Sequence, residues 1–330
     1  MNATYDIARA VALDREGRGA EAVSIVEAAA AAGLSAAMVL RGSWRIEGRL
    51  MPRDLPGGRG DMVDAHRAGN AQATRILAGL LATGTGGERD WPGALALLRD
   101  AAGGDDASAA QWEALSLMAL DAAGNPAGPL PAVEPISVSP RIGMIRNFLT
   151  GSECGLLVAL AGNRFRPATI FHEGRGAWMT DPLRRSQSAD FPIVHEWPFI
   201  HAINRRIATA SDTSVEQGEP LQILRYERGE EYRPHIDAVP GLANQRAMTC
   251  LIWLNDDYVA GETLFDALPD SPLAVRGKTG DALIFANVDD DGAPDPRTRH
   301  AGDVVRGGVK LLASRWIRAA AFDPAEQIAG

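Results

Sequence analysis

The residues best suited to chemistry lie in the run YERGEEYRPHIDAVP, where His235 and Asp237 are separated by one residue. If this run is a β-strand, residues i and i+2 point to the same face, so the imidazole and the carboxylate converge. Together they can occupy two neighbouring positions around an octahedral metal ion. Because this spacing also arises often by chance, the pair gains meaning only with a third ligand and further matching residues.

His300 is the histidine best placed to complete such a site. It follows the strand-like run GDALIFAN by a polar loop and precedes another strand-like run, so the sheet can return it to the side of His235. Two histidines and one carboxylate on one face of an iron leave three positions open, as in the facial triad of non-haem Fe(II) oxygenases. The sequence therefore predicts a metal site formed by His235, Asp237 and His300.

Lys310 lies in the strand-like run VKLLASRWIR, ten residues after His300. On a strand, Lys310 and Trp316 share one face. A lysine inside a barrel costs free energy unless it meets an anion, and a dicarboxylate cosubstrate would supply one. In the alternative, Lys310 faces solvent and the opposite face of the strand is buried.

The elements that must position these residues follow a change of pattern along the chain. Residues 1–124 are rich in alanine and leucine at helical spacing, and glycine-terminated helices recur at a period of about 35 residues, which is typical of stacked helical hairpins. Residues 125–140 are rich in proline and predict a linker. Residues 141–330 contain short β-rich runs and a few helices, which indicates an antiparallel sandwich or barrel with flanking helices.

Composition excludes several classes of protein. The formal net charge of −9 disfavours a nucleic-acid partner, since phosphate binding requires a basic surface. Two cysteines at unrelated places give neither a disulfide framework nor a zinc pattern, so we expect a reducing, cytoplasmic location. The sequence has no apolar run of the length that spans a membrane, and its first residues predict an amphipathic helix and not a signal peptide.

From about residue 140 to 320 the chain resembles the prolyl 4-hydroxylase branch of the Fe(II)/2-oxoglutarate dioxygenases. The matching runs occur in the family's order: IRNFLTGSECGLLVAL, RRSQSADFP, EPLQILRYERGEEYRPHID, NQRAMTCLIWLND, AGETLF, VRGKTGDALIFAN and RHAGDVVRGGVKLLASRWIR. In the first half, NAQATRILAGLLATGTGGERDWPGALALLRDAAG resembles the Sel1-like branch of the tetratricopeptide family. The expected fold class is therefore α+β and multidomain, with helical repeat hairpins followed by a double-stranded β-helix, or jelly roll, with flanking helices.

The resemblance also implies roles for single residues. It places iron on His235, Asp237 and His300, and it implies that Lys310 pairs with the distal carboxylate of 2-oxoglutarate.

Five further positions match the family's pockets. Tyr226, Thr263 and Trp316 fall at positions that line the cosubstrate pocket, and Tyr232 and Arg246 match positions near the peptide substrate. Each has a simpler alternative: the two tyrosines as ordinary strand aromatics, Thr263 as a turn cap, Trp316 as core and Arg246 as a surface charge.

Two segments bear on substrate binding. The glycine-containing stretch 173–190 resembles a mobile loop and strand that fold over the peptide. The sequence AVPGLANQ after Asp237 departs from the aromatic pair that often follows the metal-binding aspartate in this family.

The implied reaction is hydroxylation that uses Fe(II), 2-oxoglutarate and O2, releases succinate and CO2, and allows ascorbate as a reductant. The expected substrate is a prolyl residue in a peptide or protein, which the helical repeats could dock. The alternatives are hydroxylation of another residue, of a free amino acid or of a small metabolite, and, from a different class, an inactive repeat adaptor. No oligomeric state follows from the sequence.

Overall fold

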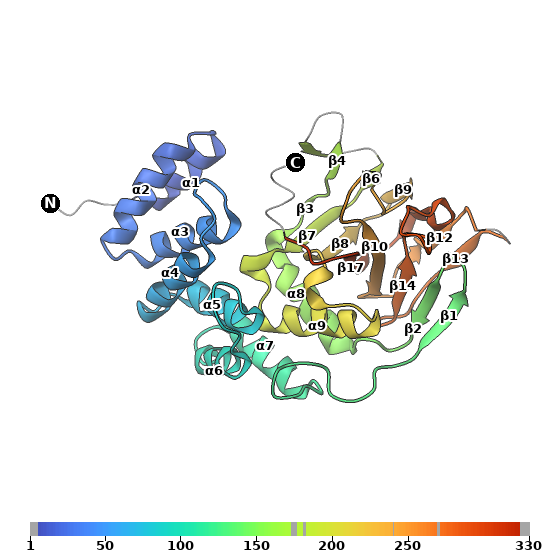
Figure 1. Cartoon of the computed structure of the whole chain (residues 1–330), viewed down its shortest axis with the longest axis horizontal. Helices are drawn as coiled ribbons and strands as arrows, with labels where there is room; N and C mark the ends of the chain where they lie inside the picture. The colour runs from blue at the N-terminus through green and yellow to red at the C-terminus, as the bar shows by residue number, and fades with distance from the viewer. Residues whose placement is uncertain (1–5, 173–176, 181–182, 240, 269–270, 324–330) are drawn as a thin grey trace. The chain divides into compact units, whose positions relative to one another are not determined.

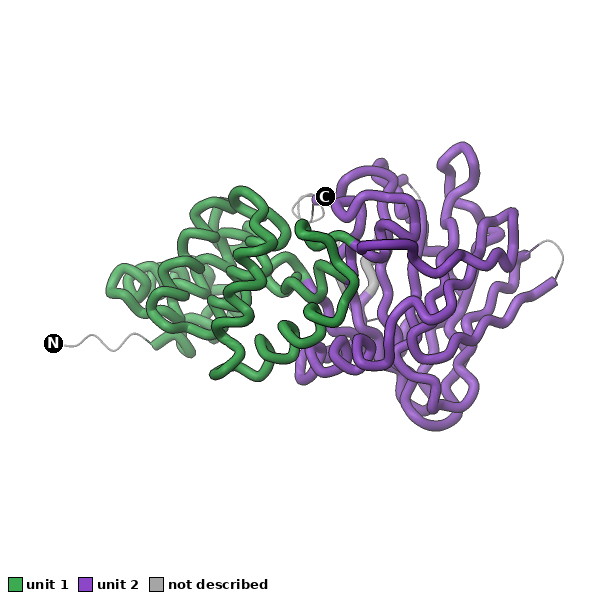
Figure 2. The backbone as a smooth tube through the Cα atoms, turned by 90° about the horizontal axis from the view of Figure 1, so that it is seen from below, with its two compact units in different colours: residues 1–125, 192–202 green, residues 126–191, 203–330 purple. Residues whose placement is uncertain are grey.

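The computed structural model describes residues 6–172, 177–180, 183–239, 241–268 and 271–323. The chain divides into two compact units, drawn in green and purple in Figure 2. Unit 1 comprises residues 1–125 and 192–202, and unit 2 comprises residues 126–191 and 203–330. A short segment of the chain's second half thus belongs to the unit formed by its first half.

Unit 1 is helical. Within its described residues, the elements before residue 125 are α1 (Ile7–Arg15), α2 (Gly19–Ala31), α3 (Ser35–Glu47), α4 (Leu55–Arg67), α5 (Ala71–Thr83), α6 (Trp91–Ala101) and α7 (Asp106–Leu117). Side chains at the residues before α4 to α7 accept hydrogen bonds from the first helical turn, as Asp54 does from the Gly57 amide. The regular spacing of these helices follows the glycines and caps in the sequence.

The core of unit 1 lies between consecutive helices. Met62, Ile76 and Leu80 of α4 and α5 are buried in one cluster, which also contains Val194 from the 3₁₀ turn Ile193–His195. This turn is part of the segment 192–202, so its apolar side chain completes the core of unit 1.

Unit 2 is built on two antiparallel sheets (Figure 1). The larger sheet has the order β1-β2-β14-β10-β17-β8-β7-β3, with strands Val133–Ser137, Ile142–Ile145, Ala282–Ala286, Arg246–Trp253, Lys310–Arg318, Leu221–Tyr226, Gln187–Phe191 and Arg166–Pro167. The smaller sheet has the order β13-β12-β15-β9-β6, with strands Leu273–Val275, Thr263–Phe265, His300–Gly302, Glu231–His235 and Arg184–Arg185. Two-stranded sheets pair β11 (Val259–Ala260) with β16 (Val305–Gly307) and β4 (Ile170–His172) with β5 (Ala177–Met179).

These two sheets form the double-stranded β-helix that the sequence resemblance implies. Strand β1 lies within residues 125–140, the stretch predicted to be a linker, and it pairs with β2 at the edge of the larger sheet. Five residues of that stretch are therefore part of the sheet and not of a connection.

The main core of unit 2 fills the space between the two sheets. Phe265 of the smaller sheet meets Phe285 of the larger sheet edge to face, with ring centroids 5.2 Å apart. The opposite face of the larger sheet is covered by α8 (Gly151–Ala161) and by the part of α9 (Pro198–Ala210) that belongs to unit 2. Arg315 of β17 donates a hydrogen bond to the carbonyl of Asn204 in that part of α9. Because both faces of the sheet are covered, strand β14 is buried along its whole length and strands β10 and β17 along most of theirs.

Within the described part of the chain, no helix is long and apolar enough to cross a membrane.

Candidate metal centre

His235 and His300 are brought together by strand pairing. Strands β9 and β15 of the smaller sheet are antiparallel, and His300 lies directly opposite His235. Opposed residues in such a pair project to the same face of the sheet. The two ring centroids are accordingly 4.3 Å apart.

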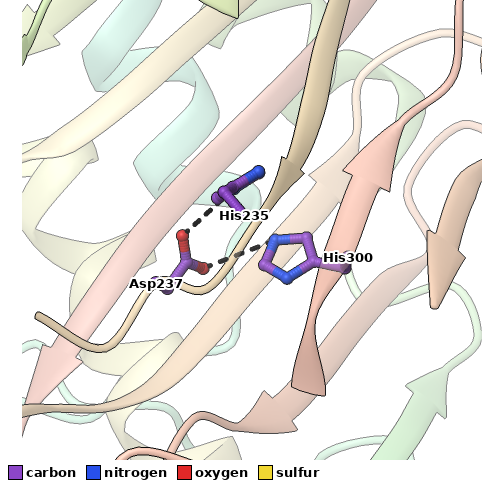
Figure 3. A group of neighbouring side chains, drawn as sticks. All are labelled: His235, Asp237 and His300. Atoms are coloured by element: carbon purple, nitrogen blue, oxygen red, sulfur yellow. Dashed lines mark ion pairs between the residues drawn. The ribbon is translucent and has the colours of Figure 1, made fainter. Parts of the chain in front are cut away.

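Asp237 reaches the two histidines from outside the strand. Strand β9 ends at His235, and Asp237 lies in the bend that follows, so the prediction that both residues share one strand is wrong for Asp237. The physical reason is that the partner strand β15 begins at His300, which leaves β9 without a neighbour beyond His235. The bend still directs the carboxylate inward: its two oxygens lie 3.4 Å from Nε2 of His235 and 3.7 Å from Nε2 of His300 (Figure 3).

The second nitrogen of each histidine is anchored to the backbone. Nδ1 of His235 donates to the carbonyl of Arg233 at 2.8 Å, and Nδ1 of His300 donates to the carbonyl of Thr298 at 3.0 Å. A carbonyl can only accept, so Nδ1 carries a proton, and in the neutral ring the lone pair is then on Nε2. Both Nε2 atoms face Asp237, so the tautomer that these carbonyls select directs the metal-binding nitrogen of each histidine toward the carboxylate.

Burial and mutual proximity set the charges of the site. Burial, together with the neighbouring His235, lowers the pKa of His300 to about 4. Burial alone would raise the pKa of the Asp237 carboxyl, but the His300 and His235 rings and the Thr249 hydroxyl hold that pKa well below its usual range. At neutral pH the site thus presents a neutral His300 imidazole and a carboxylate.

These donors fit a divalent transition metal. The ligand atoms of His235, Asp237 and His300 all lie within 4.8 Å of one another. Two imidazoles and one carboxylate on one side of an ion are the donor set of non-haem Fe(II).

Lys310 is buried on the inner face of the larger sheet. Only 2% of the residue is exposed, and its Nζ donates to the carbonyl of Gly261 at 2.7 Å. Burial lowers the pKa of this ammonium to about 8, against the opposing influence of the nearby Glu262 carboxylate. The alternative in which Lys310 faces solvent is therefore wrong.

The three positions expected to line the cosubstrate pocket are all buried. Tyr226 lies opposite Lys310 in the pairing of β8 and β17, with the Lys310 Nζ 5.4 Å from the centre of the tyrosine ring. Thr263 begins strand β12 and is not a turn cap. Trp316 lies on the same strand and face as Lys310, six residues further along.

The two positions expected near the substrate lie in different surroundings. The ring of Tyr232 stacks on His235, with centroids 3.5 Å apart. Arg246 is buried, so the alternative of a surface charge is wrong. Its guanidinium lies 3.7 Å from the centre of the Trp316 ring and donates to both carboxylate oxygens of Glu219, at 2.6 and 3.0 Å.

Several buried polar residues beside these positions were not predicted. Arg184 lies 5.3 Å from the Tyr232 ring and 5.9 Å from the Trp316 ring, and Glu219 forms a second ion pair with Arg318. Their contacts depend on which strands become neighbours, and the sequence has no local pattern for that. Of the stretch 173–190 expected to cover the peptide, residues 173–176 and 181–182 lie outside the described residues.

Comparisons with known proteins identify the superfamily and relatives of this chain. A sequence model of the 2OG-Fe(II) oxygenase superfamily matches residues 221–318, which contain the two histidines, Asp237 and Lys310. The chain is 35% identical over 201 residues to prolyl 4-hydroxylase 1 of Arabidopsis thaliana, a match that covers 56% of this chain and 71% of that protein. It is 34% identical over 207 residues to probable prolyl 4-hydroxylase 10 of the same plant, with 56% and 71% covered.

Among solved structures, the viral collagen prolyl hydroxylase of Paramecium bursaria Chlorella virus-1 in its 2OG complex is similar over 54% of this chain and 96% of that one, at 24% identity and a TM-score of 0.42. Fold, site and superfamily match together define a 2OG-Fe(II) oxygenase. Within that class, the extent of its identity to the Arabidopsis enzymes shows that the chain belongs to the prolyl 4-hydroxylase family.

Proposed function

We propose that this protein is an Fe(II)- and 2-oxoglutarate-dependent dioxygenase that hydroxylates prolyl residues in a peptide or protein. The observation that carries the proposal is the convergence of His235, Asp237 and His300 in a chain of the prolyl 4-hydroxylase family. Their donor atoms already lie within 4.8 Å of one another and both Nδ1 atoms are anchored, so little reorganisation is needed when a metal binds.

His235, Asp237 and His300 would hold the iron through the two Nε2 atoms and the carboxylate. Bound Fe(II) supplies the activation of O2 that couples decarboxylation of 2-oxoglutarate to succinate and CO2 with hydroxylation of a C–H bond, and ascorbate serves as a reductant. The chain itself binds and orients the reactants and excludes water.

Lys310 would bind the distal carboxylate of 2-oxoglutarate. The buried Lys310 ammonium donates to a neutral carbonyl, that of Gly261, and among the described residues it forms no ion pair. A carboxylate beside Lys310 would raise the pKa of the ammonium back toward its usual value and thereby gain affinity. Tyr226, Thr263 and Trp316 would form the walls of this pocket.

The substrate would lie beside Tyr232 and Arg246. Tyr232 stacks on His235, so a substrate group in contact with its ring is also near the metal. The aromatic ring of Tyr232 and the guanidinium of Arg246 suit a peptide with apolar prolyl rings and exposed carbonyl oxygens. The names of the relatives, which are prolyl 4-hydroxylases, support the same substrate class.

The helical repeats would dock an extended part of the peptide, since stacked hairpins are a common peptide-binding surface. Residues 1–124 would form repeats of the Sel1 type, and residues 141–330, apart from the segment 192–202 that belongs to unit 1, would form the dioxygenase. The protein would act in the cytoplasm, because Cys154 and Cys250 are both buried free thiols, as expected in a reducing compartment.

The test combines binding and turnover. Apoprotein is mixed anaerobically with Fe(II) and 2-oxoglutarate and monitored for a weak visible charge-transfer band, beside Asp237→Ala and Lys310→Ala. O2 is then admitted with proline-rich peptides, with free proline and with proline-free peptides, while succinate and substrate mass are measured. We expect the band in wild type alone, and peptide-dependent succinate with one added oxygen per modified proline.

Two other outcomes have definite meanings. Succinate coupled to free proline or to proline-free peptides would change the substrate class and leave the dioxygenase chemistry intact. A wild-type protein that binds iron but gives neither the band nor succinate would be an inactive repeat adaptor.

A further inference from the structure

Two buried residues that the sequence did not assign to the site, Thr249 and Asn287, form a series of hydrogen bonds that ends at Asp237. Thr249 on strand β10 is 1% exposed, and Asn287, directly after strand β14, is fully buried. The Thr249 hydroxyl lies 2.6 Å from Oδ2 of Asp237, and the Asn287 amide nitrogen lies 2.8 Å from the Thr249 hydroxyl. The two residues come from adjacent strands of the larger sheet, whereas Asp237 follows the smaller sheet.

Which group donates and which accepts in these two hydrogen bonds follows from the Asp237 carboxylate at which they end. The ionised carboxylate of Asp237 can only accept, so the Thr249 hydroxyl must donate to it. The Thr249 oxygen then accepts from Asn287, which places the amide nitrogen toward Thr249 and the amide oxygen away from it. That oxygen is buried and has no hydrogen-bond partner among the residues that the structure describes. A buried acceptor without a partner costs free energy, so this orientation of Asn287 is maintained at the expense of stability.

We infer that Thr249 and Asn287 are positioning residues that orient the Asp237 carboxylate for the metal. The inference rests on the proposed iron site. Oδ2 of Asp237 accepts from Thr249 and lies 3.7 Å from Nε2 of His300, while Oδ1 lies 3.4 Å from Nε2 of His235. The Thr249 hydrogen bond thus sets the angle at which the carboxylate faces both histidines.

We call the two hydrogen bonds from Asn287 to Thr249 and from Thr249 to Asp237 the relay. They differ from the hydrogen bonds that hold the two histidine rings. Nδ1 of His235 and of His300 is held by backbone carbonyls, which a substitution does not remove. Asp237 lies in a bend beyond its strand, and the hydrogen bond to its carboxylate comes from the side chain of Thr249. The orientation of the carboxylate therefore depends on residues 249 and 287 more than the histidines depend on any side chain.

The experiment measures metal affinity without turnover. The full-length apoprotein is titrated with Mn(II), and the free ion is followed by electron paramagnetic resonance. The variants are Thr249→Val, which keeps shape and removes the hydroxyl, Thr249→Ser, which restores it, and Asn287→Asp, which keeps shape but turns the donor into an acceptor. Asp237→Ala removes the ligand itself.

A matched control is available in unit 1. Thr74 is a buried threonine whose hydroxyl bonds to Nδ1 of His66 at 2.9 Å. Thr74→Val therefore reports the effect of losing a buried threonine hydroxyl elsewhere in the chain. We expect it to leave the dissociation constant for Mn(II) unchanged.

For the relay variants we expect a rise of the Mn(II) dissociation constant of about 10- to 100-fold in Thr249→Val, the range for removal of an outer-shell partner of a metal ligand. Asn287→Asp should match or exceed this loss, because a carboxylate accepts the threonine proton and withdraws it from Asp237. Thr249→Ser should bind close to wild type. Circular dichroism and thermal melting of each variant establish that it is folded, and Asn287→Asp carries the test if Thr249→Val is not.

Other outcomes overturn the inference at different levels. If Asp237→Ala abolishes Mn(II) binding while Thr249→Val and Asn287→Asp bind as wild type does, the relay has no positioning role and the metal site stands. If wild type itself binds no Mn(II), or Asp237→Ala binds as tightly, the proposed metal site fails and the inference fails with it.

Discussion

At the scale of single residues, the site depends on charges that are buried before any ligand arrives. Lys310 and Arg246 both lie inside unit 2, but their surroundings differ. Arg246 is neutralised by Glu219 at two short distances, whereas the Lys310 hydrogen bond goes to a neutral carbonyl. In the proposed site, Arg246 would therefore be a permanent part of the wall, and Lys310 would be the group whose charge a bound carboxylate neutralises.

The cost of burying Lys310 should appear in the pH dependence of stability. The folded-state pKa of about 8 lies below the ordinary value of 10.5, so between these pH values the unfolded chain holds a proton that the folded chain has lost. The free energy of unfolding of the apoprotein should therefore rise with pH in this window, by on the order of 3 kcal/mol. Lys310→Met should lack this rise, so the free energy of unfolding of wild type minus that of Lys310→Met should increase between pH 8 and 10.5. Urea unfolding of both proteins across this range measures the difference, and a constant difference would contradict the assignment.

Glu219 should be more important for stability than its single charge suggests, because it forms ion pairs with both Arg246 and Arg318. Glu219→Ala leaves two buried guanidiniums without an anion and should lower the free energy of unfolding by about 3 to 5 kcal/mol. Glu231→Ala, which removes a partly exposed partner of Arg185, should cost no more than about 1 kcal/mol. Denaturant unfolding compares the two, and equal losses would refute the argument.

At the scale of the element, strand β17 organises unit 2 from both of its faces. Its inner face carries Lys310 and Trp316, and its outer face carries Arg315, which is 3% exposed. Arg315 donates to the backbone carbonyls of Asn204, Val215, Gly218 and Glu219, so one side chain fixes helix α9 and the turn before β8 against the sheet.

The pairing of strands marks the limit of what the sequence could predict. His235, His300 and Lys310 could be selected as candidates because the residue types and the strand-like runs around them can be seen in the local sequence. That Asp237 leaves the strand, and that Thr249 reaches it, follows from where β15 begins and which residues of β10 face the bend. Such facts depend on the register between strands far apart in the chain, which no short pattern specifies.

Replacement of Arg315 tests whether its hydrogen bonds to four backbone carbonyls stabilise the packing of helix α9 and the turn before β8 against strand β17. Lysine keeps the charge but lacks the planar fork, so Arg315→Lys leaves several buried carbonyls without a donor and should cost about 2 to 4 kcal/mol. Arg225→Lys on the neighbouring strand β8, a partly exposed arginine paired with Glu227, should stay within about 0.5 kcal/mol of wild type. Thermal unfolding of the two variants measures this contrast. An Arg315→Lys protein as stable as Arg225→Lys would show that the four carbonyls need no guanidinium.

At the scale of the whole molecule, the boundaries of the units differ from the boundaries of the sequence patterns. The change from alanine-rich helices to β-rich runs occurs near residue 125, yet residues 192–202 belong to unit 1. Within that segment Val194 is 3% exposed and packs in the cluster of Ile76, Leu77 and Leu80. The composition of residues 192–202 gives no sign of this, because their apolar residues suit a core in either unit.

A substitution in the second half of the chain should therefore destabilise the unit built by the first half. Val194→Asp places an unpaired carboxylate in the core of unit 1 and should lower its free energy of unfolding by at least about 3 kcal/mol. Hydrogen exchange should accelerate in peptides from α5, whose side chains lose their packing against Val194, while peptides from strands β10 and β17 of unit 2 keep their protection. Val138→Asp, at a valine that is 82% exposed, is the control and should change neither set of peptides. If Val194→Asp instead accelerates exchange in β10 and β17 and spares α5, the segment belongs energetically to unit 2, and residues 192–202 would have to be reassigned to the unit that their place in the sequence suggests.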